Sequence, residues 1–374
     1  MAKIDQYLQE ALKRSASDLH FVSGDPVRAR VNGALQILMN DQLAQDTVQE
    51  ALFEIMDGTT QKAFEANEAA DFAYNIPDIS RFRVNVFRHL NGIGAIFRAI
   101  PAKALTLQEL NMPPVIHDLC KQTSGMILVT GKTGSGKSTT LAAMIDAINS
   151  NVKGHILTIE DPIEFVHQTK KSLISQREIG VHSDSFAHAL HSALREDPDV
   201  ILVGEMRDLE TISIAVTAAE MGILVMGTLH TNGAAPTVDR IINSFPADKQ
   251  AHIRAMISTS LRGVVSQQLL PKKHEPGRVA ALEVLINTSA VSNLIRQGKL
   301  DQLETAMQSG GNVGMQTMDS ALMSLVEKNV VLGRDAYQQA DNKSKFERVK
   351  DESYRATRGI IAAFSQAGTR PHVR

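Results

Sequence analysis

The segment GKTGSGKS (131–138) is the feature that most constrains how this chain can fold. It fits the pattern G-x-x-x-x-G-K-S/T and lies between the apolar run MILVT and the helical pattern TTLAAMIDAI. A strand, a glycine-rich turn and a helix in this order form the context that a phosphate-binding loop requires. A chance glycine-rich turn would lack that context. The sequence therefore predicts an α/β domain that binds a nucleoside triphosphate.

Each residue type in this loop has an expected role. Glycines let backbone N–H groups turn inward to phosphate oxygens, and the helix N-terminus adds partial positive charge. We expect Lys137 to reach the β- and γ-phosphates of ATP and Ser138 to ligate Mg²⁺. The residues expected to bind the nucleotide are Gly131, Thr133, Gly134, Ser135, Gly136, Lys137, Ser138 and Thr139.

Short apolar runs alternate with helical stretches from residue 115 onward. Four runs have this character: MILVT (126–130), HILTIE (155–160), VILVG (200–204) and ILVMGT (223–228). Unbroken apolar strands between helices indicate a parallel sheet that is buried on both faces. The region after about residue 285 reads as helical.

Acidic residues follow two of these strands. In VILVGE, Gly204 takes the place where many such enzymes carry an Asp, and Glu205 comes next. We expect Glu205 to orient the attacking water or to bind the metal through water. The alternative is an ordinary exposed acid at a strand end.

The segment TIEDPIEFVH (158–167) groups further carboxylates at the end of another strand. Neighbouring carboxylates near a phosphate site repel one another unless a cation or a positioned water offsets the charge. Glu160 and Glu164 are therefore candidates for Mg²⁺ or water coordination, with Glu160 and Ser138 as the expected metal site, partly through water. An acidic turn that begins a helix is the plainer interpretation.

The fourth strand ends in GTLHTN (227–232). His230 or Thr231 at this position can sense the γ-phosphate and report hydrolysis to the next helix, which contains Arg240. A lone histidine at a strand end is more often structural. Because polar residues also follow the other apolar strands, a functional role is favoured for this histidine.

The N-terminal region has a different pattern. Short strands, an Asn32–Gly33 hairpin and a helix around 46–66 predict a small α+β domain. In RFRVNVFRHLNGIGAIFRAI (81–100) we expect an Asn91–Gly92 turn that places Asn85 opposite Arg98 and Val86 opposite Phe97. Alternation then separates an apolar face from a face that carries three arginines, Arg81, Arg83 and Arg98.

Composition excludes several classes of protein. A net charge of −2 gives no general attraction to nucleic acid, and a single cysteine, Cys120, cannot form an internal disulfide or a multi-cysteine zinc site. The N-terminus lacks the apolar core of a signal peptide, and no run approaches the roughly 20 apolar residues of a membrane span. We expect a globular cytoplasmic protein.

With these motifs in this order, the chain resembles the secretion-superfamily hexameric ATPases. Segment 160–164 resembles the family's Asp box, 200–208 its atypical Walker B and 227–241 its His box. Three longer stretches resemble the type IV pilus retraction ATPases, PilT and PilU: ALREDPDVILVGEMRDLETI, GTLHTNGAAPTVDRIINSFPAD and GMQTMDSAL. The resemblance spans about residues 1–341.

The resemblance implies a PAS-like α+β N-terminal domain joined to a RecA-like P-loop ATPase domain with a helical C-terminal part, in a homohexameric ring. Prolines at 101 and 113–114 bracket an expected linker. The predicted organisation is a PAS-like domain at 1–100 and a linker at 101–114, followed by a RecA-like core at 115–285. A helical subdomain at 286–341 and a polar, partly disordered tail at 342–374 complete it.

Retraction is favoured over the alternatives, pilus extension or type II secretion, because those ATPases usually carry a cysteine-rich zinc insertion and a longer N-terminal region. One departure leaves the exact role open. The retraction helix Ala-Ile-Arg-Asn-Leu-Ile-Arg-Glu is matched by AVSNLIRQ (290–297), with Ser292 and Gln297 replacing Arg and Glu. A primary PilT-type and an accessory PilU-type role both remain, as does a role of the tail in partner binding.

The family's architecture suggests a purpose for the arginine face. In these rings the N-terminal domain of one subunit contacts the nucleotide bound by its neighbour. An arginine supplied in trans in this way stabilises charge in the transition state. We expect this of Arg81 and Arg98, with Arg83 as support and Arg88 structural. The resemblance also implies a partner, the inner-membrane pilus platform protein, and allows a second retraction ATPase.

Two further classes of protein fit this sequence less well. A RecA-like nucleic-acid motor would need a basic pore and stacking aromatics, and aromatic residues are scarce here. A module that binds nucleotide without hydrolysing it is disfavoured by the presence of Lys137, Ser138 and Glu205. The leading prediction is an ATP hydrolase that removes pilin subunits from the base of a fibre.

Overall fold

The computed structural model describes residues 2–31, 34–67, 69–77, 79–100 and 104–350. The chain divides into two compact units. Met1–Ala104 and Glu164–Val166 form the first unit, and Leu105–Ile163 and His167–Arg374 form the second. The expected mixed α/β class, with two sheets, is confirmed.

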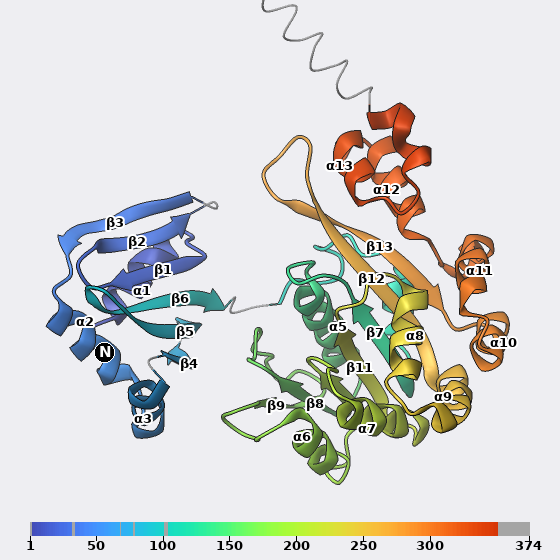
Figure 1. The fold of residues 1–374 in the computed structure, drawn as a ribbon, viewed down its shortest axis with the longest axis horizontal. Helices are drawn as coiled ribbons and strands as arrows, with labels where there is room; N and C mark the ends of the chain where they lie inside the picture. Colours follow the sequence, from blue (N-terminus) through green and yellow to red (C-terminus); the bar gives the residue numbers. More distant parts are fainter. Residues whose placement is uncertain (1, 32–33, 68, 78, 101–103, 351–374) are drawn as a thin grey trace, which may run out of the picture. The chain divides into compact units, whose positions relative to one another are not determined.

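The first unit is a six-stranded antiparallel sheet with helices packed on one face (Figure 1). Its strand order is β3-β2-β1-β6-β5-β4. The strands are β1 (Asp18–Val22), β2 (Pro26–Val31), β3 (Ala34–Gln42), β4 (Ala69–Ile76), β5 (Ser80–His89) and β6 (Gly92–Ile100). The helices are α1 (Asp5–Lys13), α2 (Gln45–Ile55) and α3 (Gly58–Asn67). The apolar core lies between these helices and one sheet face.

The register predicted for the β5–β6 hairpin was wrong by two residues. Arg83, not Asn85, lies opposite Arg98, and His89 pairs with Gly92, so Leu90 and Asn91 form the loop. Strand β1 fixes β6 from its other side, with Asp18 opposite Arg98. A shift of two residues keeps every side chain on its predicted face, because strand alternation has a period of two.

Two other details of this unit concern its connections. The single helix expected around 46–66 is two helices, α2 and α3, separated near Met56 and Asp57. The helix breaks there because Met56 adopts an extended conformation. The predicted Asn32–Gly33 turn lies outside the described residues.

The second unit contains a seven-stranded sheet in the order β13-β12-β7-β11-β10-β8-β9. All neighbours are parallel except β12 and β13. The predicted apolar runs form β7 (Gly125–Thr130), β8 (His155–Glu160), β10 (Val200–Val203) and β11 (Leu224–Leu229). The remaining strands are β9 (Leu173–Glu178), β12 (Leu261–Pro271) and β13 (Arg278–Ile286).

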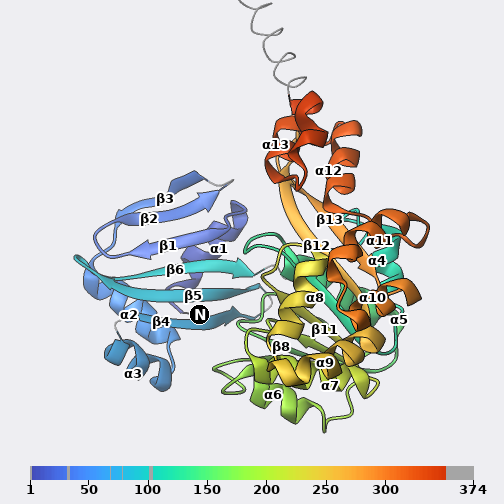
Figure 2. The ribbon, with the colours of Figure 1, turned by 45° about the vertical axis from the view of Figure 1, so that its right-hand side comes forward.

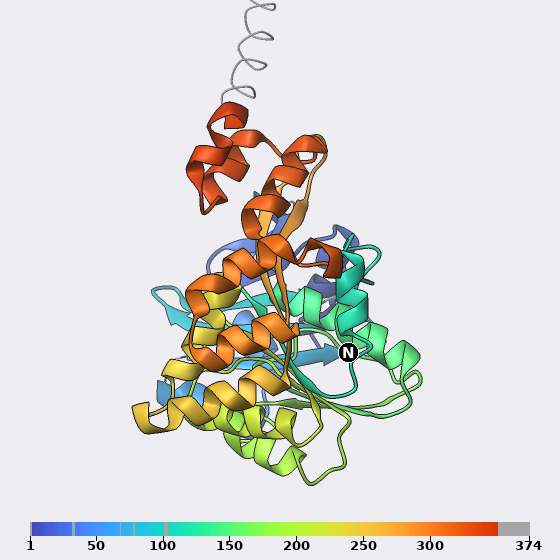
Figure 3. The same ribbon diagram turned by 90° about the vertical axis from the view of Figure 1, so that its right-hand side faces the viewer.

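Helices cover both faces of this sheet, as the apolar strands require. Alternate residues of β7 enter different cores: Met126 and Leu128 face one, and Ile127 and Val129 the other. Figure 3 shows α8–α11 stacked in yellow and orange. The helices are α4 (Pro114–Leu119), α5 (Lys137–Asn151), α6 (Phe186–Ala193), α7 (Leu209–Glu220), α8 (Ala234–Asn243), α9 (Ala247–Ser260), α10 (Ser289–Gln297) and α11 (Leu303–Ser309).

The α-helices α12 (Met318–Glu327) and α13 (Gly333–Gln339) follow, and then a 3-10 helix, η3 (Lys343–Phe346). They form a separate apolar cluster with the outer part of β12 and β13, which includes Leu270 and Ala281. Figure 2 shows the long β12–β13 ribbon running from the parallel sheet to these helices. This ribbon is therefore a direct structural link between the sheet and the C-terminal helices.

Candidate nucleotide site

The polar ends of four parallel strands meet at one edge of the second sheet. Strand β7 pairs with β11 up to Thr130 opposite Leu229, and β10 pairs with β11 up to Val203 opposite Gly227. Strand β8 joins β10, with Ile159 opposite Val203. Ligands of open α/β sheets bind outside the carboxyl ends of the strands. The registers therefore bring the phosphate loop, Glu160 and Glu205 to the same edge.

Glycines in the phosphate loop are required by both conformation and space. Gly131 has φ of 138°, and a Cβ there would lie 2.3 Å from the Gln267 carbonyl oxygen. Gly136 has φ of 88°, and its Cβ would lie 2.7 Å from Gln267 Nε2. Gly134, with φ of 77°, faces open space. The backbone can follow this path only without side chains at these positions.

The buried side chain of Gln267, on β12, forms hydrogen bonds to this loop and to the helix that follows it. Its amide Nε2 donates to the Ser135 carbonyl at 2.6 Å, and its Oε1 accepts from the Thr140 hydroxyl at 2.7 Å. One side chain thus joins the loop to the first turn of α5. Sequence analysis did not identify Gln267, although a polar Ser-Gln-Gln segment inside an apolar strand is a recognisable signal.

Lys137 begins α5, and its ammonium donates to the carbonyls of Gly131 and Lys132 at 3.0 and 3.2 Å. The loop therefore presents a positive charge next to its own backbone. The remaining predicted nucleotide ligands differ in exposure. Thr133 and Gly134 are exposed, Ser135 is buried, and Gly136, Ser138 and Thr139 are half-buried.

Glu205 is held by two basic side chains. Arg207 Nη2 lies 2.6 Å from Glu205 Oε2, and His230 Nε2 lies 2.9 Å from Glu205 Oε1. Burial raises the pKa of Glu205, but the bond from Arg207 and the nearby positive charges, including Lys137, outweigh burial and lower it. The structure therefore brings Glu205 and His230 together, and the charge of Lys137 also favours Glu205 as a carboxylate. Arg207 is a contact that sequence analysis missed.

Gly204, which precedes this acid, lies where there is little room for a side chain. A Cβ at Gly204 would lie 3.0 Å from the Ile159 carbonyl oxygen and 3.2 Å from the Glu160 Cα. The Gly204 amide donates to that carbonyl at 2.7 Å. The close approach of β10 and β8 thus disfavours an aspartate at this position.

Glu160 ends β8 within a polar network. Its Oε1 accepts from the Thr158 hydroxyl at 2.6 Å and from the Gln176 amide at 3.2 Å. These bonds fix the carboxylate at the strand end. Glu164, the other acid predicted for this role, is exposed and belongs to the first unit.

His230 and Thr231 leave β11 toward α8. The Thr231 hydroxyl lies 2.7 Å from that of Thr237, which also donates to the Gly233 carbonyl at 2.6 Å. A pocket of about 250 Å³ opens beside them, lined by Glu205, Met206, Arg207, Leu229, His230, Thr231 and Arg240. The two segments that contribute Glu205 and His230 therefore share one cavity with Arg240.

The predicted arginine face lies on the exposed side of the first unit's sheet. Arg98 Nε lies 2.9 Å from Asp18 Oδ1, and Arg83 Nε lies 3.9 Å from Asp71 Oδ1. Arg81 is half-buried. Arg88 is on the other face, where its guanidinium stacks 4.9 Å from the Phe64 ring centroid. This contact explains the structural role expected of Arg88.

The two departures from the retraction helix lie on α10. The Ser292 hydroxyl donates to the Ser258 carbonyl on α9 at 2.6 Å, and the Gln297 amide donates to Asn293 at 3.1 Å. Val291 and Ile295 are fully buried in the core of the second unit. Ser292 thus replaces a long cation by a short bond to the neighbouring helix.

The family model for type II/IV secretion system proteins matches residues 1–369. The chain is 50% identical to the type IV pilus retraction ATPase PilT of Pseudomonas aeruginosa, over 90% of this chain and 98% of that protein. It is 38% identical to the ATPase PilU of the same organism, over 91% and 89%. A crystal structure of the retraction motor PilT with bound ADP superposes with a TM-score of 0.87 at 42% identity, over 93% of this chain and all of that one.

Helices in the described ranges are all too short or too polar to traverse a lipid bilayer. The matches span nearly the full length of both proteins in each pair, so they include both sheets and the nucleotide edge. The chain therefore belongs to the type II/IV secretion system protein family and, within it, to the pilus retraction ATPases.

Proposed function

We propose that this chain hydrolyses ATP and uses the energy to drive type IV pilus retraction. The observation that carries the proposal is Glu205, an ionised acid held between Arg207 and His230 close to the ammonium of Lys137. An acid so placed can orient water for attack on a γ-phosphate. The 50% identity to a retraction ATPase, over nearly all of that protein, supports the direction of the work.

The phosphate loop has the features that ATP requires. Its left-handed glycines leave space that any Cβ would fill, and Lys137 adds a cation at the loop. Ser138 and Glu160 would hold Mg²⁺, Glu160 partly through water, and the ion would neutralise phosphate charge. The ADP bound to the similar retraction motor supports a nucleotide at this loop.

The complete site is proposed to need two subunits of a homohexamer. In this proposal Arg81 and Arg98 of one subunit stabilise charge on the nucleotide bound by its neighbour, with Arg83 as support. The exposed position of Arg98, whose side chain is 68% accessible, supports its availability to a second chain. Glu164 is proposed to contribute a second acid near the attacking water.

The proposed setting is the cytoplasmic side of the inner membrane, where the pilus platform protein would be the partner. Similarity to both PilT and PilU supports either the primary or the accessory retraction role, with the other ATPase as a further partner. The higher identity to PilT favours the primary role. Nucleic acid is not a proposed partner.

Replacement of one acid tests the enzymatic proposal. Glu205→Gln keeps the shape and removes the charge, so kcat for ATP should fall about 10²- to 10⁴-fold while nucleotide binding persists. Glu210→Gln is the matched control, because Glu210 is an exposed acid in the first turn of α7. Equal turnover of wild type and Glu205→Gln would refute the role of this acid.

A deletion strain tests the cellular proposal. Loss of twitching with excess surface pili is expected for a retraction motor. Loss of pili would instead indicate an extension ATPase. Complementation in the presence and absence of a second retraction ATPase then separates the primary from the accessory role.

A further inference from the structure

A buried acid outside the nucleotide edge connects that edge to the C-terminal helices. Glu283 lies on β13, in an otherwise apolar stretch, and only 6% of its surface is exposed. Its Oε1 accepts from the Ala234 amide at 2.6 Å, and its Oε2 accepts from the Met318 amide at 3.3 Å. These amides open α8 and α12 respectively, so one carboxylate spans the N-termini of two helices.

The bond to α8 is part of a paired anchor. Ser266 lies directly opposite Glu283 in the β12–β13 ladder, and its hydroxyl accepts from the Gly233 amide at 2.9 Å. Two opposed side chains thus receive two successive amides at the start of α8. Gly233 is only three residues after His230, which contacts Glu205. The anchor therefore fixes the start of α8, which is the end of the short segment that leads from His230 to this helix.

The segment that leads into α12 is also attached to β13 by hydrogen bonds of its own. Gln316 and Val284 exchange two backbone hydrogen bonds at 2.9 and 3.1 Å, and the Gln316 amide side chain donates to the Leu282 carbonyl. Thr317 then caps α12 by accepting from Ser320. The segment that leads into α12 is thus attached to β13 on both sides of Glu283.

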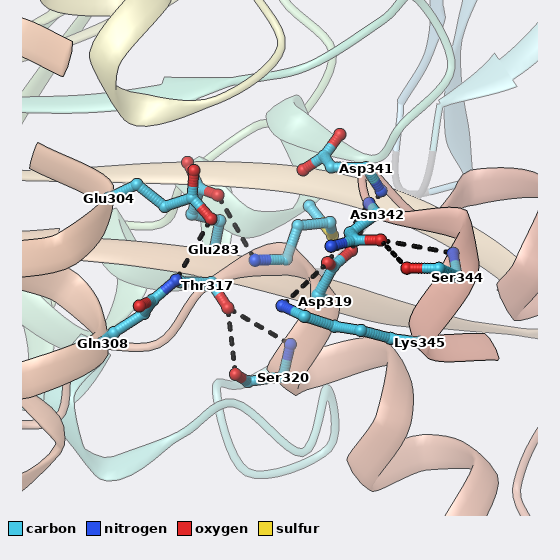
Figure 4. A network of polar contacts seen from close by, with 11 residues as sticks. Glu283, Glu304, Gln308, Thr317, Asp319, Ser320, Asp341, Asn342, Ser344 and Lys345 are labelled. Carbon is cyan, nitrogen blue, oxygen red and sulfur yellow. Dashed lines mark hydrogen bonds and ion pairs between the residues drawn. The ribbon is translucent and has the colours of Figure 1, made fainter.

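Electrostatics indicates that the two helix ends are the main compensation for this acid. Burial raises the pKa of Glu283, the two amides oppose the rise, and the charges of Asp341 and Glu304 add to it. Figure 4 shows Glu304 near Glu283, whereas Lys345 lies at the other end of the cluster. Lys345 pairs with Asp319 at 3.4 Å.

We propose that Glu283 is a positioning residue that transmits the nucleotide-dependent position of the His230–Thr231 segment to helix α12. The inference rests on the proposed ATPase function and extends it. A shift at the exit of β11 moves the first amides of α8, and Glu283 carries that displacement to the first amide of α12. Two helices whose first amides bond to the two oxygens of one carboxylate cannot move independently without loss of a buried hydrogen bond.

Glu283→Gln tests the link, because an amide side chain has only one acceptor oxygen and cannot satisfy both helix ends. Amide hydrogen exchange of 318–327 is compared in the full-length chain with and without a non-hydrolysable ATP analogue. Wild type should show a nucleotide-dependent change in exchange, and Glu283→Gln should lose it, with kcat about tenfold lower and analogue affinity kept within about twofold.

Glu304→Gln is the matched control, since Glu304 is an exposed acid close to Glu283 that makes neither helix contact. It should retain the response of α12. An unchanged response in Glu283→Gln, or no response in wild type, would overturn the inference. Failure of the proposed function is separate, because it would appear as absence of ATP hydrolysis in wild type.

A second pair of variants leaves Glu283 in place. Met318→Pro and Met318→Ala both shorten the same buried side chain, but only proline lacks the amide that donates to Glu283. Proline is compatible with the first helical position, where Met318 lies. The nucleotide response of α12 should be lost in the proline variant and kept in the alanine variant. Equal responses in the two variants would also overturn the inference.

Discussion

The two sheets of this chain use polar side chains in different ways. The parallel sheet is buried on both faces and gathers its polar residues at one edge, where Lys137, Glu205 and His230 affect one another. The antiparallel sheet has one face on which the described arginines Arg98 and Arg83 are exposed, and each has a carboxylate from a neighbouring strand. The first arrangement lowers the pKa of Glu205, whereas the second pairs exposed arginines with carboxylates.

This difference has a consequence for how a complete site forms. At the nucleotide edge the phosphate loop is held by the buried Gln267 side chain, and Glu205 is held by Arg207 and His230. On the arginine face the Arg98 side chain is 68% accessible although its partner Asp18 is buried, and we propose that Arg98 exchanges Asp18 for an anion such as a phosphate. The edge is therefore preformed, whereas the role proposed for the arginine face requires a nucleotide bound by a second chain.

The largest effect is expected from the arginine face. Arg98→Ala should lower kcat about 10³-fold or more and leave ATP binding intact, because an arginine supplied in trans acts on transition-state charge. Steady-state ATPase assays and a fluorescent nucleotide titration measure the two quantities. Arg88→Ala is the control, since Arg88 stacks on Phe64 on the opposite face. Wild-type turnover of Arg98→Ala would refute the proposed role of the arginine face.

A change in the preformed edge should act on binding instead. Gly131→Ala forces a side chain into contact with the Gln267 carbonyl at a left-handed position, so ATP affinity should fall about 100-fold. Gly222→Ala carries similar backbone strain, with φ of 102°, but has open space around its Cβ. Isothermal titration should show the loss only for Gly131→Ala. Similar affinities would contradict the spatial argument.

Removal of the support below the loop should have a smaller effect. Gln267→Ala leaves the Thr140 hydroxyl and the Ser135 carbonyl without their buried partner, at a cost of about 1–3 kcal/mol. The KM for ATP should rise about tenfold. Gln268→Ala, one residue along the same strand, should leave the KM unchanged. An unaffected KM in Gln267→Ala would show that the loop does not need this support.

The smallest effect concerns acid stability of the first unit. Burial raises the pKa of Asp18, but bonds from Ser17 and Arg98 lower it below its ordinary value of 3.8. A lowered carboxyl pKa stabilises the folded state above that ordinary value, and the stabilisation is lost as the pH falls through the folded-state pKa. Arg98→Ala removes one lowering contact, so hydrogen exchange of β1 and β6 should accelerate at a higher pH than in wild type.

Arg83→Ala serves as the control for this pH dependence. Its partner Asp71 is exposed and 3.9 Å away, so the pair should contribute little. The exchange profile of Arg83→Ala should match wild type between pH 3 and 7. If both variants shifted equally, the specific role of the Asp18–Arg98 pair would be refuted.

Local sequence patterns predicted much of this molecule. The strands β7, β8, β10 and β11 are contiguous apolar runs, and the phosphate loop follows one of them, so each is readable without its neighbours. The arginine face was also predicted despite the wrong register. The Asn-Gly signal did not reveal that β1 pairs with β6. In the structure, β6 has this long-range pairing on one side and a hairpin to β5 with its loop at Leu90 and Asn91 on the other.

What could not be predicted depends on long-range contacts. Gln267 acts on a loop more than 120 residues earlier in the chain, and Glu283 joins helices from distant segments. Periodicity cannot reveal such pairings, because it describes only the neighbours along one element. Polar residues inside an otherwise apolar strand are the available signal. Both residues carry that signal.

Subunit mixing tests the central claim, that the edge of one chain and the arginine face of another form one site. Arg98→Ala and Lys137→Ala proteins are each expected to be inactive, and they are mixed under conditions that allow subunit exchange. Random equimolar rings contain about a quarter of sites with both intact halves, so ATPase activity should return to about that fraction of wild type. A mixture that stays as inactive as its two components would contradict the claim.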